Sequence, residues 1–423
     1  MRRMDAAGLR RRAGRGEQDV SPWKPNPLIS KGRAVSGADF FFSIFPFTYY
    51  VVFVGLHIAS MIGIFLELAR EKKALASPEK ALPSVSLIIP IHNESDRMEG
   101  LLKSFETLDY PKAEYIFIND RSEDKSQDMI DAFINKAGKE KARCIFLKEN
   151  PGPNHKQYAL TRGIEVSSGE FLLFTDADCQ LPPYWVQGMV KRMSDSKTGV
   201  ILGPVLKRWG GNGFFAEKWF FHLYQCYEHG IRFVYLAGAT GLGAAGGGFG
   251  NNLILRRSCL DAVGGYENVP PSPTEDAALI SRIRSCSNYK IRAALGEDVH
   301  VITHGEKTWK TLANQTLRWN NGGLFSPDLT TRLNYNFLMI TIAMGVLALP
   351  LLPFFPFLWP LPAGVLTSML FNNFANLCLF GCSLPKGKFF GYALTLLFTP
   401  VYFSFMTILG YLGFKPKWKG QET

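Results

Sequence analysis

The stretch FLLFTDADC, residues 171–179, runs through five largely apolar residues and then ends in two aspartates, Asp176 and Asp178, separated by one alanine. A short apolar run that stops at polar residues is typical of a strand buried on both faces of a sheet. Two carboxylates at the tip of such a strand form either a solvated turn or an oxygen site for a divalent cation. The rest of the chain decides between these two interpretations.

Similar apolar runs alternate with amphipathic segments upstream of this stretch. SVSLIIPIHNE (84–94), AEYIFINDRSED (113–124) and ARCIFLKEN (142–150) each predict a strand, and 95–110, 124–138 and 156–167 each predict a helix. Strands that alternate with helices of 10–15 residues predict an α/β domain, with a parallel sheet, helices on both faces and the ligand beyond the carboxyl ends of the strands.

Acidic or amide residues stand at three of these predicted strand ends. They are His92–Glu94, Asn119–Asp120 and Asp176–Asp178. Because parallel strands end at one edge of a sheet, we expect the three clusters to converge. Mg²⁺ or Mn²⁺ typically uses one or two carboxylates and completes its shell with substrate phosphates. The pattern therefore favours a cation site for a diphosphate substrate over three separate turns.

Long apolar segments flank the polar region. Residues 39–69 hold roughly 25 consecutive uncharged residues, enough to cross about 30 Å of hydrocarbon, and 335–413 hold three further runs. The predicted organisation is a basic tail (1–38), a transmembrane segment (39–69), a soluble domain (70–333), three transmembrane or interfacial helices (334–413) and a tail (414–423).

The distribution of positive charge predicts the orientation, with one conflict. AREKKALASPEK (69–80) and LPKGK (384–388) are lysine-rich, which predicts that both loops and the soluble domain are cytoplasmic. A single first span would then place the six arginines between Arg2 and Arg15 outside. Either the first run is a hairpin or interfacial segment, or the sequence starts upstream of the natural start.

Charge and cysteine content exclude other classes. The formal net charge of +11 is concentrated in the tail and the juxtamembrane loops, where basic residues meet anionic headgroups. No nucleic-acid-binding motif accompanies it, so no nucleic acid partner is expected. The seven cysteines lack a paired zinc spacing and predict a reducing compartment without a disulfide framework.

Five motifs occur in this order along the chain: SLIIPIHNE, INDRSED, FTDADC, PTEDAAL and QTLRW. In this order they resemble the inverting, membrane-bound family 2 glycosyltransferases, a group that includes cellulose, hyaluronan and chitin-oligosaccharide synthases and ceramide glucosyltransferases. The resemblance covers about residues 84–323. It implies a GT-A-like fold that binds a nucleotide sugar, here expected to be a uridine diphosphate (UDP) sugar, with Mg²⁺ or Mn²⁺.

The same resemblance implies roles for individual residues. Asp120 is similar to the acid that contacts the nucleotide base, and Pro90 and Glu94 belong to the turn beside the nucleoside. Lys156 matches a lysine near the nucleotide or phosphate. Asp176 resembles the acid that contacts the sugar or nucleotide and contributes to the metal site, and Asp178 the direct metal ligand.

The TED tripeptide, residues 274–276, implies the catalytic base. Asp276 resembles the carboxylate that removes the proton of the acceptor hydroxyl during direct displacement, and Glu275 is the alternative. The same residues also fit an N-terminal helix cap with first-turn acids. Both interpretations hold together if the capped helix end presents the base.

QTLRW (315–319) places Gln315, Arg318 and Trp319 on one helical face by spacing. The guanidinium of Arg318 suits diphosphate oxygens, and Trp319 offers a flat surface for a sugar ring. The alternative is an amphipathic helix at the membrane surface. In the glycine-rich segment 238–257, the resemblance implies that Gly250 and Asn251 face the donor sugar or the acceptor, and a flexible loop is the alternative.

HVITH (300–304) does not predict a two-histidine metal site. On a strand the two histidines share a face, but a rise of about 3.3 Å per residue separates them by roughly 13 Å. The alternative that one of the two histidines lies near the site by itself stays open.

Three functions remain. A single sugar added to a lipid and processive polysaccharide synthesis with secretion both fit, and the small number of spans slightly favours a lipid or short-chain acceptor. The third is a non-catalytic membrane protein that keeps the fold to bind a sugar nucleotide. In each case we expect a multi-pass protein of the cell (inner) membrane with a cytoplasmic domain.

Overall fold

The computed structural model describes residues 37–78, 82–208, 218–381, 389–418 and 421–422. The chain divides into two compact units, Met1–Ile44 and Phe45–Thr423. The arginine-rich tail and the LPKGK segment, on which the orientation argument depended, lie outside the described residues.

The regular elements have the following bounds. The strands are β1 Val85–Ile91, β2 Ala113–Asp120, β3 Ala142–Leu147, β4 Phe171–Phe174, β5 Cys179–Gln180, β6 Thr198–Leu202, β7 Val205–Lys207, β8 Leu253–Arg256, β9 Lys290–Ala293, β10 Val301–Thr303, β11 Lys417–Trp418 and β12 Gln421–Glu422. The α-helices are α1 Gly37–Leu75, α2 Glu99–Thr107, α3 Ser126–Ala137, α4 His155–Val166, α5 Trp185–Arg192, α6 Trp219–Gly241, α7 Arg257–Ala262, α8 Glu275–Cys286, α9 Trp309–Leu324, α10 Leu329–Ala348, α11 Pro360–Phe380 and α12 Phe389–Tyr411. Short 3₁₀ helices are η1 Tyr266–Asn268, η2 Glu297–Val299, η3 Leu349–Leu351 and η4 Pro356–Leu358.

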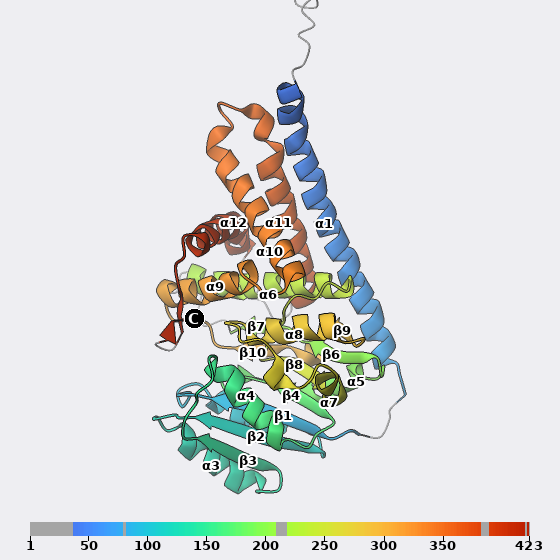
Figure 1. Ribbon diagram of the computed structural model, residues 1–423, viewed down its shortest axis with the longest axis vertical. Coiled ribbons are helices and arrows are strands. Elements are labelled where there is room, and N and C mark those ends of the chain that lie inside the picture. Colours follow the sequence, from blue (N-terminus) through green and yellow to red (C-terminus); the bar gives the residue numbers. More distant parts are fainter. Residues whose placement is uncertain (1–36, 79–81, 209–217, 382–388, 419–420, 423) are drawn as a thin grey trace, which may run out of the picture. The chain divides into compact units, whose positions relative to one another are not determined.

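A seven-stranded sheet in the order β3-β2-β1-β4-β8-β6-β9 forms the centre of the soluble part (Figure 1). β3, β2, β1 and β4 are parallel, and only β8 pairs antiparallel to its neighbours. The α/β class expected from the alternating pattern is therefore confirmed. A second, three-stranded sheet in the order β5-β10-β7 was not predicted, because its strands are only two or three residues long.

Apolar residues on both faces of each strand explain why helices cover both sides. In β1, Ile88 packs into one core with residues of α4, α6 and α8, whereas Leu87 and Ile89 pack into another with residues of α2, α3 and α5. Successive side chains of a strand point to opposite faces, so an uninterrupted apolar run requires cover on both. The predicted helices on both faces are present.

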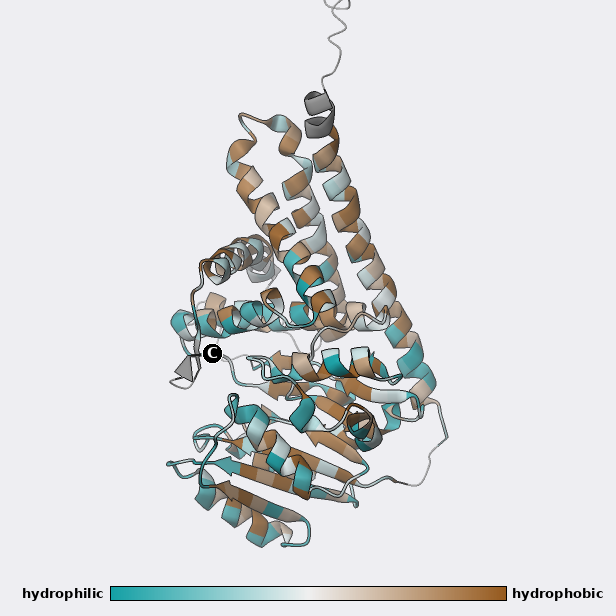
Figure 2. Ribbon diagram, viewed as in Figure 1, coloured by the Kyte–Doolittle hydropathy of each residue, from teal (hydrophilic) through white to brown (hydrophobic). Residues whose placement is uncertain are grey.

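Within the residues that the structure describes, four helices are long and apolar enough to cross a membrane by length and composition. They span Ile44–Leu75, Leu329–Leu351, Pro356–Phe380 and Gly391–Tyr411, the brown ribbons of Figure 2. Large apolar side chains remain exposed along them, among them Phe65 at 68% and Phe374 at 66%. Prolines in the α10–α11 connection end one helix and begin the next, since proline cannot continue a regular helix.

Two further helices, α6 and α9, lie between the spans and the sheets (Figure 1). α6 packs against β7 and β9 on one side and against α11 and α12 on the other. It also approaches α1 very closely, since a side chain added at Gly63 would overlap the backbone of Gly238. α6 was not predicted from the sequence; in the structure most of its side chains are buried.

A buried guanidinium ties the end of α1 to the soluble part. Arg192, whose side chain is 3% exposed, binds Glu71 of α1 at 2.5 Å and Asp298 of η2 at 2.7 Å. Glu71 also accepts the backbone amides of Leu295 and Gly296. The end of α1 is thereby held against the loop that follows β9.

Replacing Arg192 by alanine is expected to lower the free energy of unfolding by about 3–5 kcal/mol, because the buried carboxylate of Glu71 would lose its partner. The measurement is the midpoint of thermal unfolding in detergent. Lys191→Ala, at the exposed neighbouring position, is the matched control. Equal midpoints for both variants would show that this ion pair does not hold α1 in place.

Candidate active site

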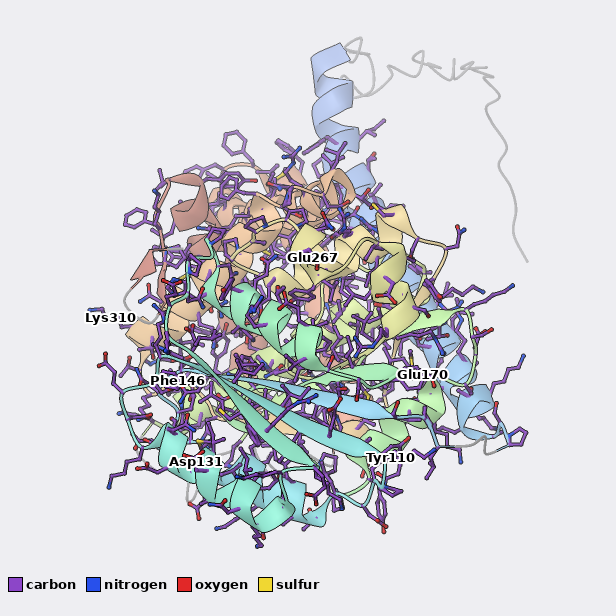
Figure 3. The ribbon with its side chains drawn as sticks, turned by 60° about the horizontal axis from the view of Figure 1, so that its bottom comes forward. Tyr110, Asp131, Phe146, Glu170, Glu267 and Lys310 are labelled. Atoms are coloured by element: carbon purple, nitrogen blue, oxygen red, sulfur yellow. The ribbon has the colours of Figure 1, made fainter. Side chains whose placement is uncertain are left out.

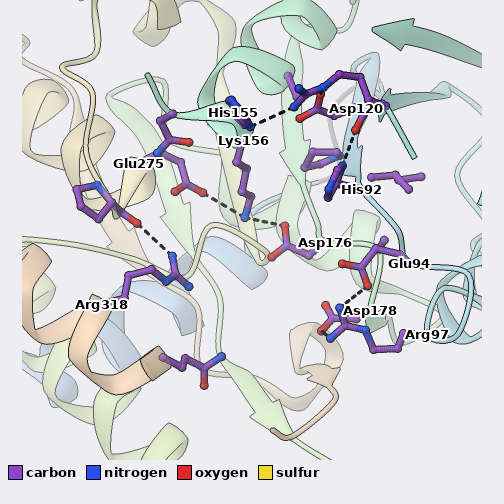
Figure 4. Close-up of a pocket in the computed structure, with 18 of the residues that line it drawn as sticks. His92, Glu94, Arg97, Asp120, His155, Lys156, Asp176, Asp178, Glu275 and Arg318 are labelled. Carbon is purple, nitrogen blue, oxygen red and sulfur yellow. Dashed lines mark hydrogen bonds and ion pairs between the residues drawn. The ribbon is translucent and has the colours of Figure 1, made fainter. Parts of the chain in front are cut away.

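A cavity of about 650 Å³ opens at the carboxyl ends of β1, β2 and β4 (Figure 4). All three predicted polar clusters contribute to it, through His92 and Glu94, Asp120, and Asp176 and Asp178. Residues from α4, α8 and α9 complete the wall. The convergence expected of parallel strand ends is thus observed.

The end of the cavity beside β1 and β2 carries an acid held in a fixed orientation. Asp120 is 5% exposed and accepts one hydrogen bond from Arg121 at 2.8 Å and one from Asn150 at 2.9 Å. Pro90 also lines this region, and Glu94 binds Arg97 at 2.6 Å. A carboxylate whose two oxygens are fixed by neighbours offers a defined acceptor to a base or a ribose.

Lys156, the second residue of α4, lies between two carboxylates. Its ammonium is 2.8 Å from Asp176 and 3.1 Å from Glu275 (Figure 4). Burial alone would lower the pKa of this ammonium, but the two carboxylates outweigh burial and raise the pKa well above its usual value. Lys156 is therefore a permanent positive charge at the centre of the cavity.

Asp178 is less constrained than Asp176. Its nearest cation is Arg97, at 3.7 Å, and its side chain is 19% exposed. His304 lines the same cavity, and burial lowers the pKa of its imidazole although Asp178 opposes that shift. Carboxylate oxygens suit Mg²⁺ or Mn²⁺, and a neutral imidazole adds a nitrogen ligand that suits a transition metal rather than Mg²⁺.

The described residues fit a cation that is shared with a substrate. Among them, no group of three or more His, Cys, Asp or Glu side chains is placed to hold a metal ion alone. Asp176, expected as a metal ligand, is engaged by Lys156. Most of the coordination shell would therefore come from phosphate oxygens and water, the usual arrangement for Mg²⁺.

The two candidate bases lie in different surroundings. Glu275 lines the cavity, whereas Asp276 does not. The carboxylate of Asp276 instead accepts the backbone amides of Gly250 at 2.9 Å and Ala277 at 2.7 Å. Burial, followed by the charge of Glu275, raises the pKa of Asp276 to about 6, although Lys156 acts in the opposite direction.

The α9 motif is divided between two locations. Gln315 and Arg318 line the cavity; Gln315 donates to Glu306 at 2.9 Å and Arg318 to the carbonyl of Pro273 at 3.1 Å. Trp319 does not line it. Its indole instead packs against α6, with the Arg232 guanidinium 4.9 Å from the ring centre.

The predicted residues of the glycine-rich segment also lie outside the cavity lining. Gly250 is the amide donor to Asp276, and a β-carbon there would approach that side chain to 3.2 Å. The side chain of Asn251 reaches the sulfur of Cys179, 3.5 Å away. The segment therefore touches the candidate base rather than the region beside Asp120.

The chain matches a known protein family over most of its length. The sequence profile of glycosyl transferase family 21 matches residues 52–423, which include both the cavity and the four apolar helices. The chain belongs to glycosyl transferase family 21. This membership confirms the expected resemblance to membrane-associated glycosyltransferases of GT-A type, whereas assignment to family 2 itself is not confirmed.

Curated relatives of this family 21 chain are glycosyltransferases with limited overlap. The probable glycosyltransferase YdaM of Bacillus subtilis is 28% identical over 265 residues, covering 58% of this chain and 56% of YdaM. The beta-monoglucosyldiacylglycerol synthase of a Nostoc species is 24% identical over 297 residues, covering 67% of this chain and 60% of that enzyme. The chain thus spans less than two thirds of each.

A solved mannosyltransferase from Pyrobaculum calidifontis, in complex with GDP-mannose and Mn²⁺, covers 88% of the family 21 chain. The match covers 99% of that enzyme, with 17% identity and a TM-score of 0.47.

Among the cavity residues that were given no role from the sequence are Arg97, Lys207 and Glu306. His304 and Glu306 follow β10; the apolar run HVITH indicated a strand there and left one histidine near the site open, but no motif marked Glu306. Of the two histidines there, only His304 lines the cavity. His300 is buried and contacts the carbonyl of Leu295 at 3.2 Å.

Proposed function

We propose that this family 21 protein transfers a sugar from a UDP-sugar to the hydroxyl group of a membrane-borne acceptor, with inversion at the anomeric carbon. The observation that carries the proposal is the convergence of Asp120, Asp176, Asp178, Lys156 and Arg318 on one cavity. Acids suit a nucleoside and a cation, and the two cations suit a diphosphate. The four apolar helices of the described residues, which lie beyond α6 and α9, favour an acceptor held in the bilayer.

In the proposed donor complex, Asp120 binds the nucleoside and Arg318 and Lys156 bind the diphosphate. Asp178, with His304, would hold Mg²⁺ or Mn²⁺, which offsets the charge that builds on the leaving diphosphate. Lys156 also neutralises Asp176 and Glu275, so the cavity admits an anionic substrate despite its many acids.

In the proposed reaction, Asp276 takes the proton of the acceptor hydroxyl. The oxygen then forms its bond to the anomeric carbon, and the bond from that carbon to the diphosphate oxygen breaks, with the electron pair leaving on UDP. Direct displacement requires acceptor and leaving group on opposite faces of the anomeric carbon. The carboxylate of Asp276 lies beside Gly250, outside the lining of the 650 Å³ cavity that would hold the donor. This position agrees with an acceptor on the face opposite the leaving group.

The acceptor class separates two versions of this function. A lipid that receives one sugar is the first, and the relative named beta-monoglucosyldiacylglycerol synthase supports it. Processive synthesis is the second, supported by matches to poly-beta-1,6-N-acetyl-D-glucosamine synthases at 34% identity over 127 residues. Both versions require the soluble domain (70–333) to face the cytoplasm, where nucleotide sugars are made.

The experiment that tests the function uses the full-length protein in native membranes and in lipid nanodiscs. Radiolabelled UDP-glucose, UDP-galactose, UDP-N-acetylglucosamine and GDP-mannose are supplied with Mn²⁺, and the products are separated by organic extraction. Label in the lipid fraction supports a lipid acceptor, and label in polymer supports processive synthesis. Nucleotide binding without transfer or hydrolysis of any donor would instead identify a binding protein.

Arg318→Lys is expected to lower kcat/KM for the donor about tenfold, mainly through KM, because lysine cannot present a planar pair of donors to diphosphate oxygens. Initial rates over a range of donor concentrations measure the effect. Lys310→Gln, at an exposed position earlier in α9 (Figure 3), should leave both constants unchanged. A loss confined to kcat would contradict a role of Arg318 in donor binding.

A further inference from the structure

A second cavity, of about 290 Å³, lies away from the donor cavity. It is enclosed by the end of α1, the end of α5 and strands β6 and β9. Its charged lining consists of Glu67, Arg70, Glu71, Lys73, Arg192, Asp195 and Arg292. No residue of the proposed reaction contributes to it.

The two glutamates of this cavity are already satisfied, whereas Asp195 is exposed and accepts the backbone amide of Lys197 at 3.0 Å. Glu67 binds Arg70 at 2.6 Å and accepts the backbone amide of Ala293 at 2.9 Å. Glu71 binds Arg192 at 2.5 Å and accepts two further backbone amides. These acids therefore have little capacity left to neutralise additional cations.

By comparison, two cations of the lining lack a close carboxylate partner. The closest carboxylate to Arg292 is that of Glu67, 3.9 Å away, a long distance for an ion pair. Lys73 is exposed and forms no ion pair with the part of the chain that the structure describes. Burial lowers the pKa of Arg292; the carboxylates of Glu67 and Asp195 oppose this shift, and the charge of Arg70 adds to it. These two cations are therefore available to bind an anion.

The position along α1 places this cavity at the edge of the bilayer. Large exposed apolar side chains are frequent along α1 from Ile44 to Leu68, after which Arg70 and Lys73 follow, with Leu75 as a further exposed apolar residue. At 1.5 Å per residue, Lys73 lies about 8 Å beyond Leu68 along the helix axis. The headgroup layer on each side of a bilayer is about 5–8 Å thick. The basic residues therefore fall at the level of lipid phosphates.

We propose that this juxtamembrane cavity binds the phosphate of an anionic phospholipid, contacted by Arg70, Lys73 and Arg292. The four cations of the lining exceed its three carboxylates by one, which matches the single charge of a phosphodiester. The lipid would bridge α1 to β9 beside the Arg192 ion pair. The site is independent of the proposed sugar transfer and would exist in a non-catalytic protein too.

The test is native mass spectrometry of the full-length protein mixed in detergent with phosphatidylglycerol or phosphatidylcholine. The variant Lys73→Gln/Arg292→Gln removes two charges from the cavity. Lys72→Gln/Lys191→Gln removes two exposed charges that do not line it. We expect the cavity variant to retain about tenfold less phosphatidylglycerol than wild type, and the control to match wild type.

The variant Arg292→Lys, in which Lys73 is unchanged, should retain as much phosphatidylglycerol as wild type, since the charge of the cavity stays the same. Equal losses in the cavity variant and the control would overturn the proposal, because binding would then follow net charge alone. Equal retention of phosphatidylcholine by wild type would also overturn it. Displacement of bound lipid by an equal concentration of inorganic phosphate would identify a free-anion site in place of a lipid site.

Discussion

Replacing Asp178 by asparagine is expected to lower kcat/KM for sugar transfer about 1,000-fold. The substitution keeps the shape of the side chain but removes the charge that would hold the cation against the diphosphate. Loss of metal stabilisation worth about 4 kcal/mol in the transition state corresponds to that factor. Asp178 is the acid suited to this role, because its carboxylate has no close basic partner whereas Asp176 binds Lys156.

Two measurements separate this role from a structural one. Transfer rates are followed over a range of Mn²⁺ concentrations, and Mn²⁺ binding in the presence of UDP is measured by electron paramagnetic resonance. Asp131→Asn on α3 (Figure 3) is the matched control, since Asp131 is exposed and remote from the cavity lining. An Asp178→Asn protein that binds Mn²⁺·UDP as wild type does would remove Asp178 from the metal site.

The second large effect concerns the candidate base. Asp276→Asn is expected to lower kcat by about 10²–10⁴-fold with little change in donor KM, the range typical of a lost general base. The side chain is nearly isosteric and can still accept the amide of Gly250. Glu275→Gln should instead lower donor KM, because it removes a negative charge that competes with the diphosphate for Lys156.

The pH dependence provides a sharper test of the same assignment. Burial and the charge of Glu275 raise the pKa of Asp276 to about 6. A base acts in its deprotonated form, so kcat should rise with pH through about 6 and level off above it. Glu275→Gln removes a negative neighbour, which lowers the pKa of Asp276 and moves the inflection to lower pH. An unchanged inflection in Asp276→Asn would transfer the role of base to another group.

Much of the active-site edge could be predicted from sequence because the relevant signals are local. The apolar runs before Glu94, Asp120 and Asp176 identify buried strands, and parallel strands end at the same edge. The three polar clusters directly follow these strands, so they come together at that edge. The roles given to individual residues there stay predictions.

Several features could not be predicted because they depend on contacts between distant segments. Helical spacing correctly groups Gln315 with Arg318, yet Trp319, one position further, turns toward Arg232 of α6. No local pattern reveals that α6 lies there. His304 joins the cavity through a three-residue strand whose partners, β5 and β7, are equally short.

By itself, then, the sequence determined the α/β class, the apolar helices and the acidic strand ends. These follow from the period and length of apolar runs, which act within a few residues. Tertiary structure alone decided that Lys156 joins Asp176 to Glu275, that Asp276 lies outside the donor cavity, and that Arg192 meets Glu71, 121 positions away. Such pairings depend on how whole elements pack, and many packings are compatible with the same local pattern.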